Sequence, residues 1–294
     1  MGEQCTILYP ADFFDLKKVD GDYEAEYREA LKFPELRILF YNYDEFAAGG
    51  ALRFYPVAFQ GGLCIYRGWM LQPQAYEALY RALEERGLRL VNTPSEYENC
   101  HEFPNSYPLL KAFTPQIMVY NMDQAIDWQA VREQLGKFMM KDYVKSVKGA
   151  DFPAFFDQTY PDEEMDRYRA EFVRLRDRLF VKGIVLKAYV DLKKTDGATN
   201  EYRAFYLYGK RITLSKNSNQ KRDAPVPEAF LRQMPSLPSN FYTIDFAELA
   251  DGNWIVVETG DGQVSGLSPG QYAFKFYEEL LRGMASANRK EKLS

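Results

Sequence analysis

The feature that most constrains the fold is an apolar hairpin near the end of the chain. Two apolar runs, FYTIDFAEL and NWIVVE, flank an Asp-Gly pair at 251–252. Asp-Gly between such runs is a strong signal for a two-residue β-turn. Counting back from that turn pairs Asp245 with Glu258. Side chains directly opposed in such a ladder have Cβ atoms about 4.5–5.5 Å apart, so the two carboxylates should lie together.

Two like charges at that spacing repel and weaken the sheet. A divalent cation between them reverses the sign of the effect. Asp261 follows Glu258 in a glycine-flanked turn, from which it can reach the same ion. The alternative is a solvent-exposed pair that tolerates its own repulsion. Because the flanking runs indicate burial, and unpaired buried carboxylates are costly, we predict a metal site made of Asp245, Glu258 and Asp261.

The composition narrows the chemistry further. The 294 residues include one histidine, which argues against a Ser-His-Asp triad or a multi-histidine zinc site and leaves catalysis to carboxylates, lysine and arginine. The formal net charge of −5 argues against nucleic acid as the main partner.

The same survey bears on location. No run approaches the ~20 apolar residues that span a bilayer, and the three cysteines are too widely spaced for a disulfide framework or a zinc pattern. We therefore expect a cytoplasmic protein without a membrane partner, and the sequence leaves its oligomeric state open.

A lysine-rich segment is the second candidate site. The run FMMKDYVKSVKG places Lys141, Lys145 and Lys148 in or just after a strand, where three point charges and a glycine can surround a polyphosphate. The alternative is a solvated basic loop. The chain has neither a P-loop nor a G-x-G-x-x-G fingerprint, so those nucleotide folds lack support.

Other charged residues interrupt apolar strands. Glu201 and Arg203 stand two apart in one strand and therefore face the same side. Lys187 lies within the apolar run GIVLKAYVDL. Arg67, at a strand end in CIYRGWM, is either a clamp for a substrate carboxylate or phosphate, or a structural ion pair, and the sequence favours neither.

The order of elements predicts two different sheet types. The first third alternates buried strands with a helix at 74–86, which indicates βαβ units and a parallel sheet. Further helices are expected at 123–135, 161–179 and 269–284. The later strands look antiparallel, with a turn at Tyr208-Gly209-Lys210. The proline-rich segment 97–115 is expected to be an irregular crossing between two lobes.

Together these segments resemble the ATP-grasp superfamily. The matching order is an α/β lobe, a lysine-bearing strand, an apolar hinge strand, the E-x-R strand, and then an Asp strand and a Glu strand. More narrowly, DYVKSVKG, EYRAFYLYG and ETGDGQVSGL resemble the superfamily's arginine/lysine-signature clade, over most of the chain. The resemblance implies an α+β class: an N-terminal α/β (pre-ATP-grasp) domain at 1–115, and an ATP-grasp domain with a pair of antiparallel-sheet lobes at 116–294.

The resemblance also implies roles for single residues. Asp245 and Glu258 would bind Mg²⁺, and Arg203 would assist the phosphates or an acyl phosphate, with Arg67 holding the substrate carboxylate. The superfamily usually has Asn two residues after the metal-binding Glu, whereas this chain has Gly260, and Asp261 is the residue that would replace that Asn. The residues expected at bound ATP are Lys141, Lys145, Lys187, Ala188, Tyr189, Val190, Asp191 and Glu201.

The function implied is a Mg²⁺- and ATP-dependent ligase. ATP would phosphorylate a carboxylate, and an amine of a small molecule or peptide would displace the phosphate. Two alternatives remain: a kinase on the same scaffold, and a catalytically inactive nucleotide-binding module, which the departure at Gly260 favours.

Overall fold

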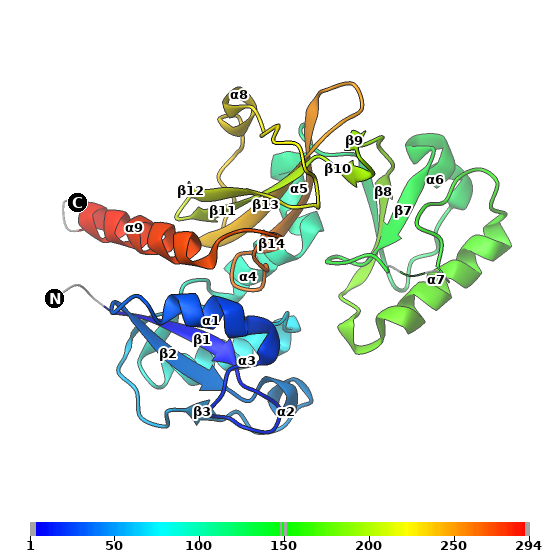
Figure 1. The fold of residues 1–294 in the computed structure, drawn as a ribbon. Coiled ribbons are helices and arrows are strands. Elements are labelled where there is room, and N and C mark those ends of the chain that lie inside the picture. The colour runs from blue at the N-terminus through cyan, green and yellow to red at the C-terminus, as the bar shows by residue number, and fades with distance from the viewer. Residues whose placement is uncertain (1–3, 148, 150–151, 292–294) are drawn as a thin grey trace.

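The computed structural model describes residues 4–147, 149 and 152–291 (Figure 1). Its first third forms a five-stranded sheet in which all strands except the edge strand β3 run parallel, as the alternating pattern predicts. In spatial order the strands are β3 (Phe54–Tyr55), β2 (Leu36–Tyr41), β1 (Cys5–Pro10), β4 (Gly62–Tyr66) and β5 (Leu88–Leu90).

Helices cover both faces of this sheet. One face packs on α1 (Glu24–Ala30) and on the last helix, α9 (Ala273–Glu291). The other face packs on α3 (Pro73–Glu84). A 3-10 turn (Gly21–Tyr23) and α2 (Tyr43–Ala47) complete this part. Because α9 is shared with the C-terminal sheet, the N-terminal and C-terminal parts of the chain have one continuous core.

The crossing segment is helical, which corrects the expectation of an irregular connection. It contains the second half of α4 (Pro94–His101) and all of α5 (Phe103–Leu110). Proline is tolerated in the first turn of a helix, where the missing N–H has no partner. Thr93 and Glu96 form a capping box at the start of α4. Both helices pack against strand β14 (Trp254–Asp261) of the C-terminal sheet. The expected domain boundary near residue 115 stays a prediction.

The middle of the chain forms a three-stranded antiparallel sheet in the order β6 (Ile117–Asn121), β8 (Gly183–Ala188), β7 (Phe138–Lys141). One face packs on α6 (Trp128–Leu135) and α7 (Asp162–Arg176). Two boundaries differ from expectation. Helix α6 begins five residues later, where Asp127 caps it, and α7 gives way to a 3-10 turn at Asp177–Leu179.

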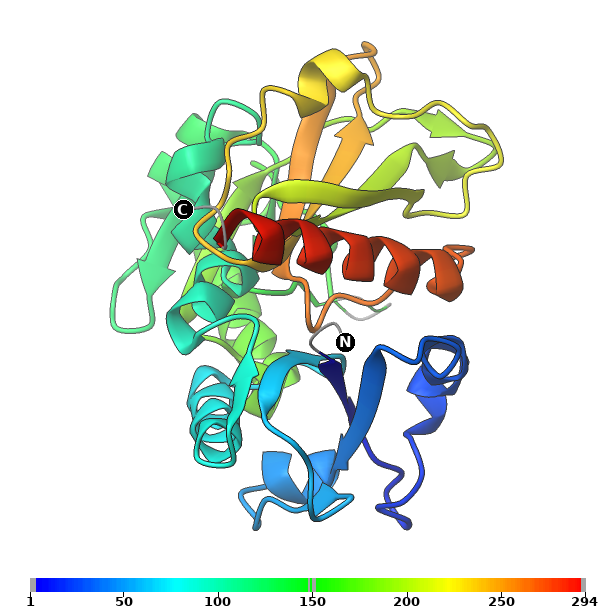
Figure 2. The same ribbon diagram turned by 90° about the vertical axis from the view of Figure 1, so that its left-hand side faces the viewer.

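The C-terminal sheet is antiparallel, in the order β12 (Lys210–Lys216), β11 (Glu201–Leu207), β13 (Phe241–Glu248), β14 (Trp254–Asp261). Figure 2 shows α9 running between this sheet and the N-terminal part. The remaining elements are β9 (Lys194–Thr195), β10 (Ala198–Thr199) and α8 (Glu228–Leu231). Helix α9 begins at Ala273, later than the expected 269, and continues past 284.

The predicted pairing of Asp245 with Glu258 is confirmed, although the turn differs. Glu248 faces Trp254, so the connection spans 249–253 and is longer than two residues. A β-bulge at Val257 then shifts the register by one and restores the pairing of the two carboxylates. The described part of the chain contains no helix with the length and apolar character that crossing a membrane requires.

Candidate active site between two antiparallel sheets

The candidate site lies where β14 meets the three-stranded sheet. Glu258 points toward Lys141 at the end of β7, with 3.0 Å between its Oε1 and the lysine Nζ. Lys145, in the loop after β7, approaches the other carboxylate oxygen to 3.5 Å. Burial raises the pKa of Glu258, but the charges of Lys141 and Lys145 outweigh burial and hold that pKa well below its usual range. Glu258 is therefore an anion held between two cations.

Lys187 adds a third amine to this cluster. Met139 is the register partner of Lys187, so Lys141 and Lys187 lie on one face of the three-stranded sheet. The bulge at Val257 presents a backbone carbonyl that accepts a hydrogen bond from Lys187 Nζ, 2.5 Å away. The ring of Phe103 lies 4.3 Å from the same Nζ. Burial, and then the charge of Lys141, lower the pKa of Lys187 to about 7.

The second carboxylate has an arginine partner. Arg203 on β11 binds Asp245 through two hydrogen bonds, of 2.7 and 2.6 Å, and Asn217 Nδ2 donates to the same carboxylate at 3.2 Å. Arg203 also donates to the carbonyl of Gly266 at 3.0 Å. Glu201, on the same strand, accepts a hydrogen bond from Thr199 rather than from Arg203.

Asp261 lies apart from the other two carboxylates. Side chains alternate along a strand, so Glu258 and Asp261 point to opposite faces of β14. Asp261 is fully buried, where it accepts hydrogen bonds from Asn92 Nδ2 and from the backbone N–H of Gln263. Burial outweighs these bonds and raises its pKa to about 7. The structure does not bring Asp261 to the other two carboxylates.

Gly260 stands on the same face as Glu258, and its neighbours fill the space beside it. A Cβ added there would lie 2.7 Å from Ser265 Oγ and 2.9 Å from Thr243 Oγ1. Those two hydroxyls are hydrogen-bonded to one another at 2.9 Å. The place of a longer side chain at this position is therefore taken by Ser265 and Thr243.

Arg67 forms a buried ion pair, which is the structural alternative to a clamp for a substrate carboxylate or phosphate. Its guanidinium is fully buried and forms two hydrogen bonds with Glu26, of 2.7 and 3.0 Å. It also donates to the carbonyls of Gly262 and Ser265, at 2.6 and 2.8 Å. With its donors taken by these groups, Arg67 fixes the loop after β14 to the N-terminal sheet. A direct role at the substrate stays a prediction.

The segment expected beside adenine connects the two antiparallel sheets. Tyr189 N donates to the carbonyl of Lys137, and Ala250 N donates to the carbonyl of Asp191. Its residues Ala188 to Asp191 are exposed or half-buried. Lys148 lies outside the described residues.

Three contributors to these networks escaped the sequence analysis. Asn217, Phe103 and Asn92 contact Asp245, the lysine cluster and Asp261, respectively. Each comes from a distant part of the chain, and nothing in the local sequence marks it. His101 is buried, and burial lowers its pKa to about 3, so it is neutral beside the cluster.

The donor set suits a metal–polyphosphate complex. Two carboxylates face one another in register, and three lysines and an arginine surround them. Mg²⁺ typically takes one or two carboxylates and fills its other positions with phosphates and water. Among the described residues no group of three or more His, Cys, Asp or Glu side chains forms a metal cage by itself. Such a site needs the ligand's own oxygens.

Comparisons with known proteins agree with this geometry. The model of an ATP-grasp domain, family 3 of the arginine/lysine-signature clade, matches residues 127–280. A comparison with curated protein sequences finds no match.

Solved structures share the fold of the whole chain at low identity. D-alanine–D-alanine ligase from Bacillus anthracis is 11% identical with a TM-score of 0.58, over 99% of this chain and 100% of that one. D-cycloserine synthetase DcsG is 14% identical with a TM-score of 0.58, over 94% and 99%. The ATP-grasp ligase PsnB, complexed with a minimal precursor, is 11% identical with a TM-score of 0.58, over 97% and 100%. These similarities confirm the predicted α+β, ATP-grasp fold.

Proposed function

Because the chain belongs to family 3 of the arginine/lysine-signature clade of ATP-grasp proteins, we propose that it is a Mg²⁺- and ATP-dependent ligase that joins a carboxylate to an amine. ATP would supply the phosphoryl group that activates the carboxylate as an acyl phosphate. The substrates would be a small-molecule or peptide acid and an amine; the similar structures include D-alanine–D-alanine ligase and PsnB bound to a minimal precursor.

One observation carries the proposal: Lys141, Lys145 and Lys187 converge on Glu258, beside the Arg203–Asp245 pair. In the ligand-free protein the cations and carboxylates neutralise one another. When Mg²⁺ and phosphates are present, the carboxylates can turn to the metal and the lysines to the phosphate oxygens. The charges are therefore already placed for phosphoryl transfer, where positioning and charge neutralisation supply most of the catalysis.

The individual roles follow from position. Asp245 and Glu258 would hold Mg²⁺. Lys141 and Lys145 would bind phosphate oxygens, and Lys187, whose amine is buried, would bind phosphate where water competes least. Arg203 would stabilise the negative charge that develops on the phosphorylated carboxylate.

The segment between β8 and β9 would border the nucleotide, since it joins the two sheets that flank the cluster. Ala188, Tyr189, Val190 and Asp191 would line the base and ribose, and Glu201 would complete that side of the pocket. Asp261 and Arg67 would support the site from the N-terminal part without touching ATP.

Substitution of the two proposed metal ligands tests the function. We expect Asp245→Asn and Glu258→Gln to abolish substrate-dependent ADP formation while the protein stays folded. The matched control is Asp251→Asn, an exposed carboxylate in the hairpin connection, which should retain wild-type turnover. The assay is ADP release with Mg²⁺–ATP and small-molecule extract, with mass spectrometry of the products.

Wild-type turnover in both variants would contradict the proposed metal site. The products separate the alternatives. An amide formed together with ADP and phosphate supports the ligase, whereas a stable phosphorylated product without an amide identifies a kinase. Binding of Mg²⁺–ATP without turnover of any substrate identifies an inactive nucleotide-binding module.

A further inference from the structure

A groove of about 530 Å³ runs beside the edge strand β12, on the side of the sheet where α9 begins. Five consecutive residues of β12, 212–216, form one wall. The loop 269–272 and the side chains of Lys275, Phe276 and Glu279 form the other. The volume falls within the range of small-ligand sites, yet none of the roles proposed above uses this groove.

The consecutive residues show that the groove follows the edge of β12. Successive side chains of a strand point to opposite faces, so a pocket on one face would be lined by alternate residues. Within the described chain the strand partner of β12 is β11, and no strand pairs with its other side. The backbone N–H and C=O groups of that other side therefore border the groove, as on any open sheet edge.

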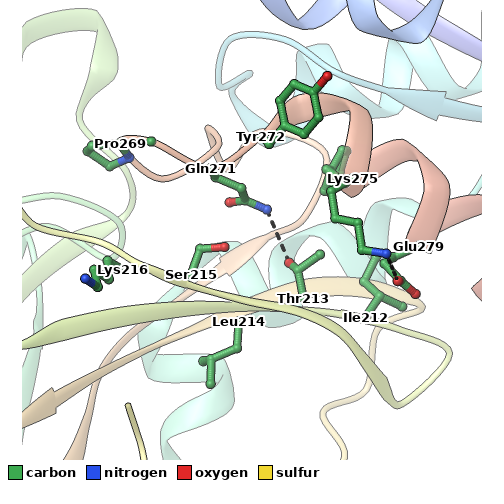
Figure 3. A pocket seen from close by; sticks show the side chains of 12 residues that line it. Ile212, Thr213, Leu214, Ser215, Lys216, Pro269, Gln271, Tyr272, Lys275 and Glu279 are labelled. Atoms are coloured by element: carbon green, nitrogen blue, oxygen red, sulfur yellow. Dashed lines mark hydrogen bonds and ion pairs between the residues drawn. The ribbon is translucent and has the colours of Figure 1, made fainter. Parts of the chain in front are cut away.

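The opposite wall is a helix face. Residues 272, 275, 276 and 279 are spaced three and four apart, so they lie along one side of α9 and the turn before it. Figure 3 shows Gln271 reaching across to Thr213, whose Oγ1 accepts its hydrogen bond at 3.3 Å. A strand edge beside a helix is an arrangement in which proteins bind extended peptides as an added strand.

The lysines of the groove do not favour an anionic ligand. Lys275 forms ion pairs with Glu278 and Glu279, at 2.7 and 2.9 Å. Lys216 lies 3.8 Å from Asp223. Both lysines lie beside carboxylates, so the groups of the groove left to bind a ligand are chiefly the backbone N–H and C=O groups along the edge of β12. A polypeptide offers hydrogen-bond donors and acceptors at the matching spacing. Five strand residues, at about 3.3 Å each, accommodate roughly five residues of peptide.

One end of the groove adjoins the candidate active site. Asn217 follows directly after Lys216, and its Oδ1 accepts a hydrogen bond from Ser268 at 3.1 Å. Its Nδ2 donates to Asp245, a proposed metal ligand. A chain lying along β12 would therefore end beside the Arg203–Asp245 pair.

We propose that this groove binds an extended peptide segment as an additional strand along β12. The peptide directs its terminus or a side chain toward Asp245. Peptide binding is inferred from the groove alone. The delivery of a reacting group toward Asp245 rests in addition on the proposed ligase function.

Peptide binding without nucleotide tests the proposal. The probe is a synthetic pool of decapeptides with randomised side chains, used beside a second pool in which alternate backbone amides are N-methylated. Bound peptides are isolated with the protein and counted by mass spectrometry. We expect the wild type to retain peptides from the first pool and at least about tenfold fewer from the second, because N-methylation removes the backbone donors.

Three variants locate the binding. Thr213→Trp fills the groove and should reduce retention at least about tenfold, whereas Thr213→Val keeps its shape and should leave retention unchanged. Val119→Trp places the same bulk on β6, an edge strand of the other sheet whose Val119 is 39% exposed, and should also leave it unchanged. If Thr213→Trp fails to fold, the comparison of the two pools on the wild type decides the question.

Three results would overturn the proposal. The wild type could retain both pools equally, or retain no peptide at all. The wild type and folded Thr213→Trp could also retain peptides equally. Hydrogen-exchange protection of residues 212–216 that grows with protein concentration, without peptide, would assign the groove to a second copy of the chain and overturn it too. Mg²⁺–ATP binding is measured separately by calorimetry. Absence of peptide retention by the wild type, with intact nucleotide binding, therefore overturns the proposed peptide site and leaves the proposed function standing.

Discussion

The two faces of β14 give two carboxylates opposite electrostatic environments. Glu258 faces lysines from the three-stranded sheet, and its pKa lies well below the usual range. Asp261, three residues later, faces the N-terminal part of the molecule, where its side-chain partners are neutral amides, and its pKa is raised to about 7. Burial acts on both carboxyl groups, so the partners decide the direction of the shift.

The comparison extends to the arginines beside them. Arg203 joins Asp245 on the face of Glu258, and both side chains keep some solvent contact, at 17% and 10%. Arg67 joins Glu26 at the junction with the N-terminal part, where its side chain is 1% exposed. The ion pair beside Glu258 therefore holds charges that can exchange partners with a ligand. The ion pair at the junction with the N-terminal part holds charges whose partners are fixed.

The largest effect expected from this difference is on stability. Arg67→Ala should lower the free energy of unfolding by about 3–5 kcal/mol, because it removes a fully buried cation, leaves Glu26 with only the Tyr277 hydroxyl as donor, and frees the carbonyls of Gly262 and Ser265. Arg203→Ala should cost less, because the Arg203 side chain is 17% exposed and donates to one backbone carbonyl, that of Gly266. Urea denaturation of both variants measures the difference.

Mg²⁺ sharpens this test. The ion should restore part of the stability of Arg203→Ala, since Asp245 is a proposed ligand, and none of the stability of Arg67→Ala. Equal losses in the two variants, with equal responses to Mg²⁺, would remove the distinction between the two ion pairs.

The two carboxylates should respond to acid with opposite sign. In unfolded protein a carboxyl group titrates near pH 4. Between about pH 4 and 7 the folded state keeps a proton on Asp261 that the unfolded state has lost, so this group makes stability rise as the pH falls, by at most about 1.4 kcal/mol per pH unit. For Glu258 the folded pKa is depressed, so its contribution is full above the unfolded pKa and is lost as the pH falls through the folded value.

Denaturation curves from pH 3 to 8 in the presence of EDTA check this, with Asp261→Asn and Glu258→Gln as the matched pair. The stability difference between wild type and Asp261→Asn should grow in favour of the wild type as the pH falls from 7 to 4. The corresponding difference for Glu258→Gln should stay level in that range and shrink only at lower pH. Parallel curves for all three proteins would contradict the assigned environments.

Local sequence rules predicted what depends on nearby residues. Counting from a two-residue Asp-Gly turn paired Asp245 with Glu258, because strand pairing propagates from the turn. The turn itself was wrong, and the pairing is correct only because the bulge at Val257 offsets the longer connection by one residue. The Thr93/Glu96 capping box was a readable helix signal just before the segment 97–115, whose prolines indicated an irregular connection.

Long-range partners could not be predicted. Glu26 lies 41 residues before Arg67, and Asn92 lies 169 residues before Asp261, so no spacing rule connects either pair. The side on which Asp261 points was readable, because residues 258 and 261 differ by an odd number and a strand alternates with a period of two. The glycines around Asp261 suggested a flexible turn instead, but Asp261 is the last residue of β14.

The smallest expected effect concerns Gly260, on the face of Glu258. Gly260→Ala should lower the free energy of unfolding by about 1–3 kcal/mol, a typical cost of overpacking, since the new Cβ would lie 2.7 Å from Ser265 Oγ. Adding Ser265→Ala removes that oxygen and should recover part of the loss, so the two substitutions should couple favourably in a double-mutant cycle. Additive losses would show that this part of the face is open rather than filled. A position filled by Ser265 and Thr243 has no room for a third metal ligand, and the proposed metal site then depends on Asp245 and Glu258 alone.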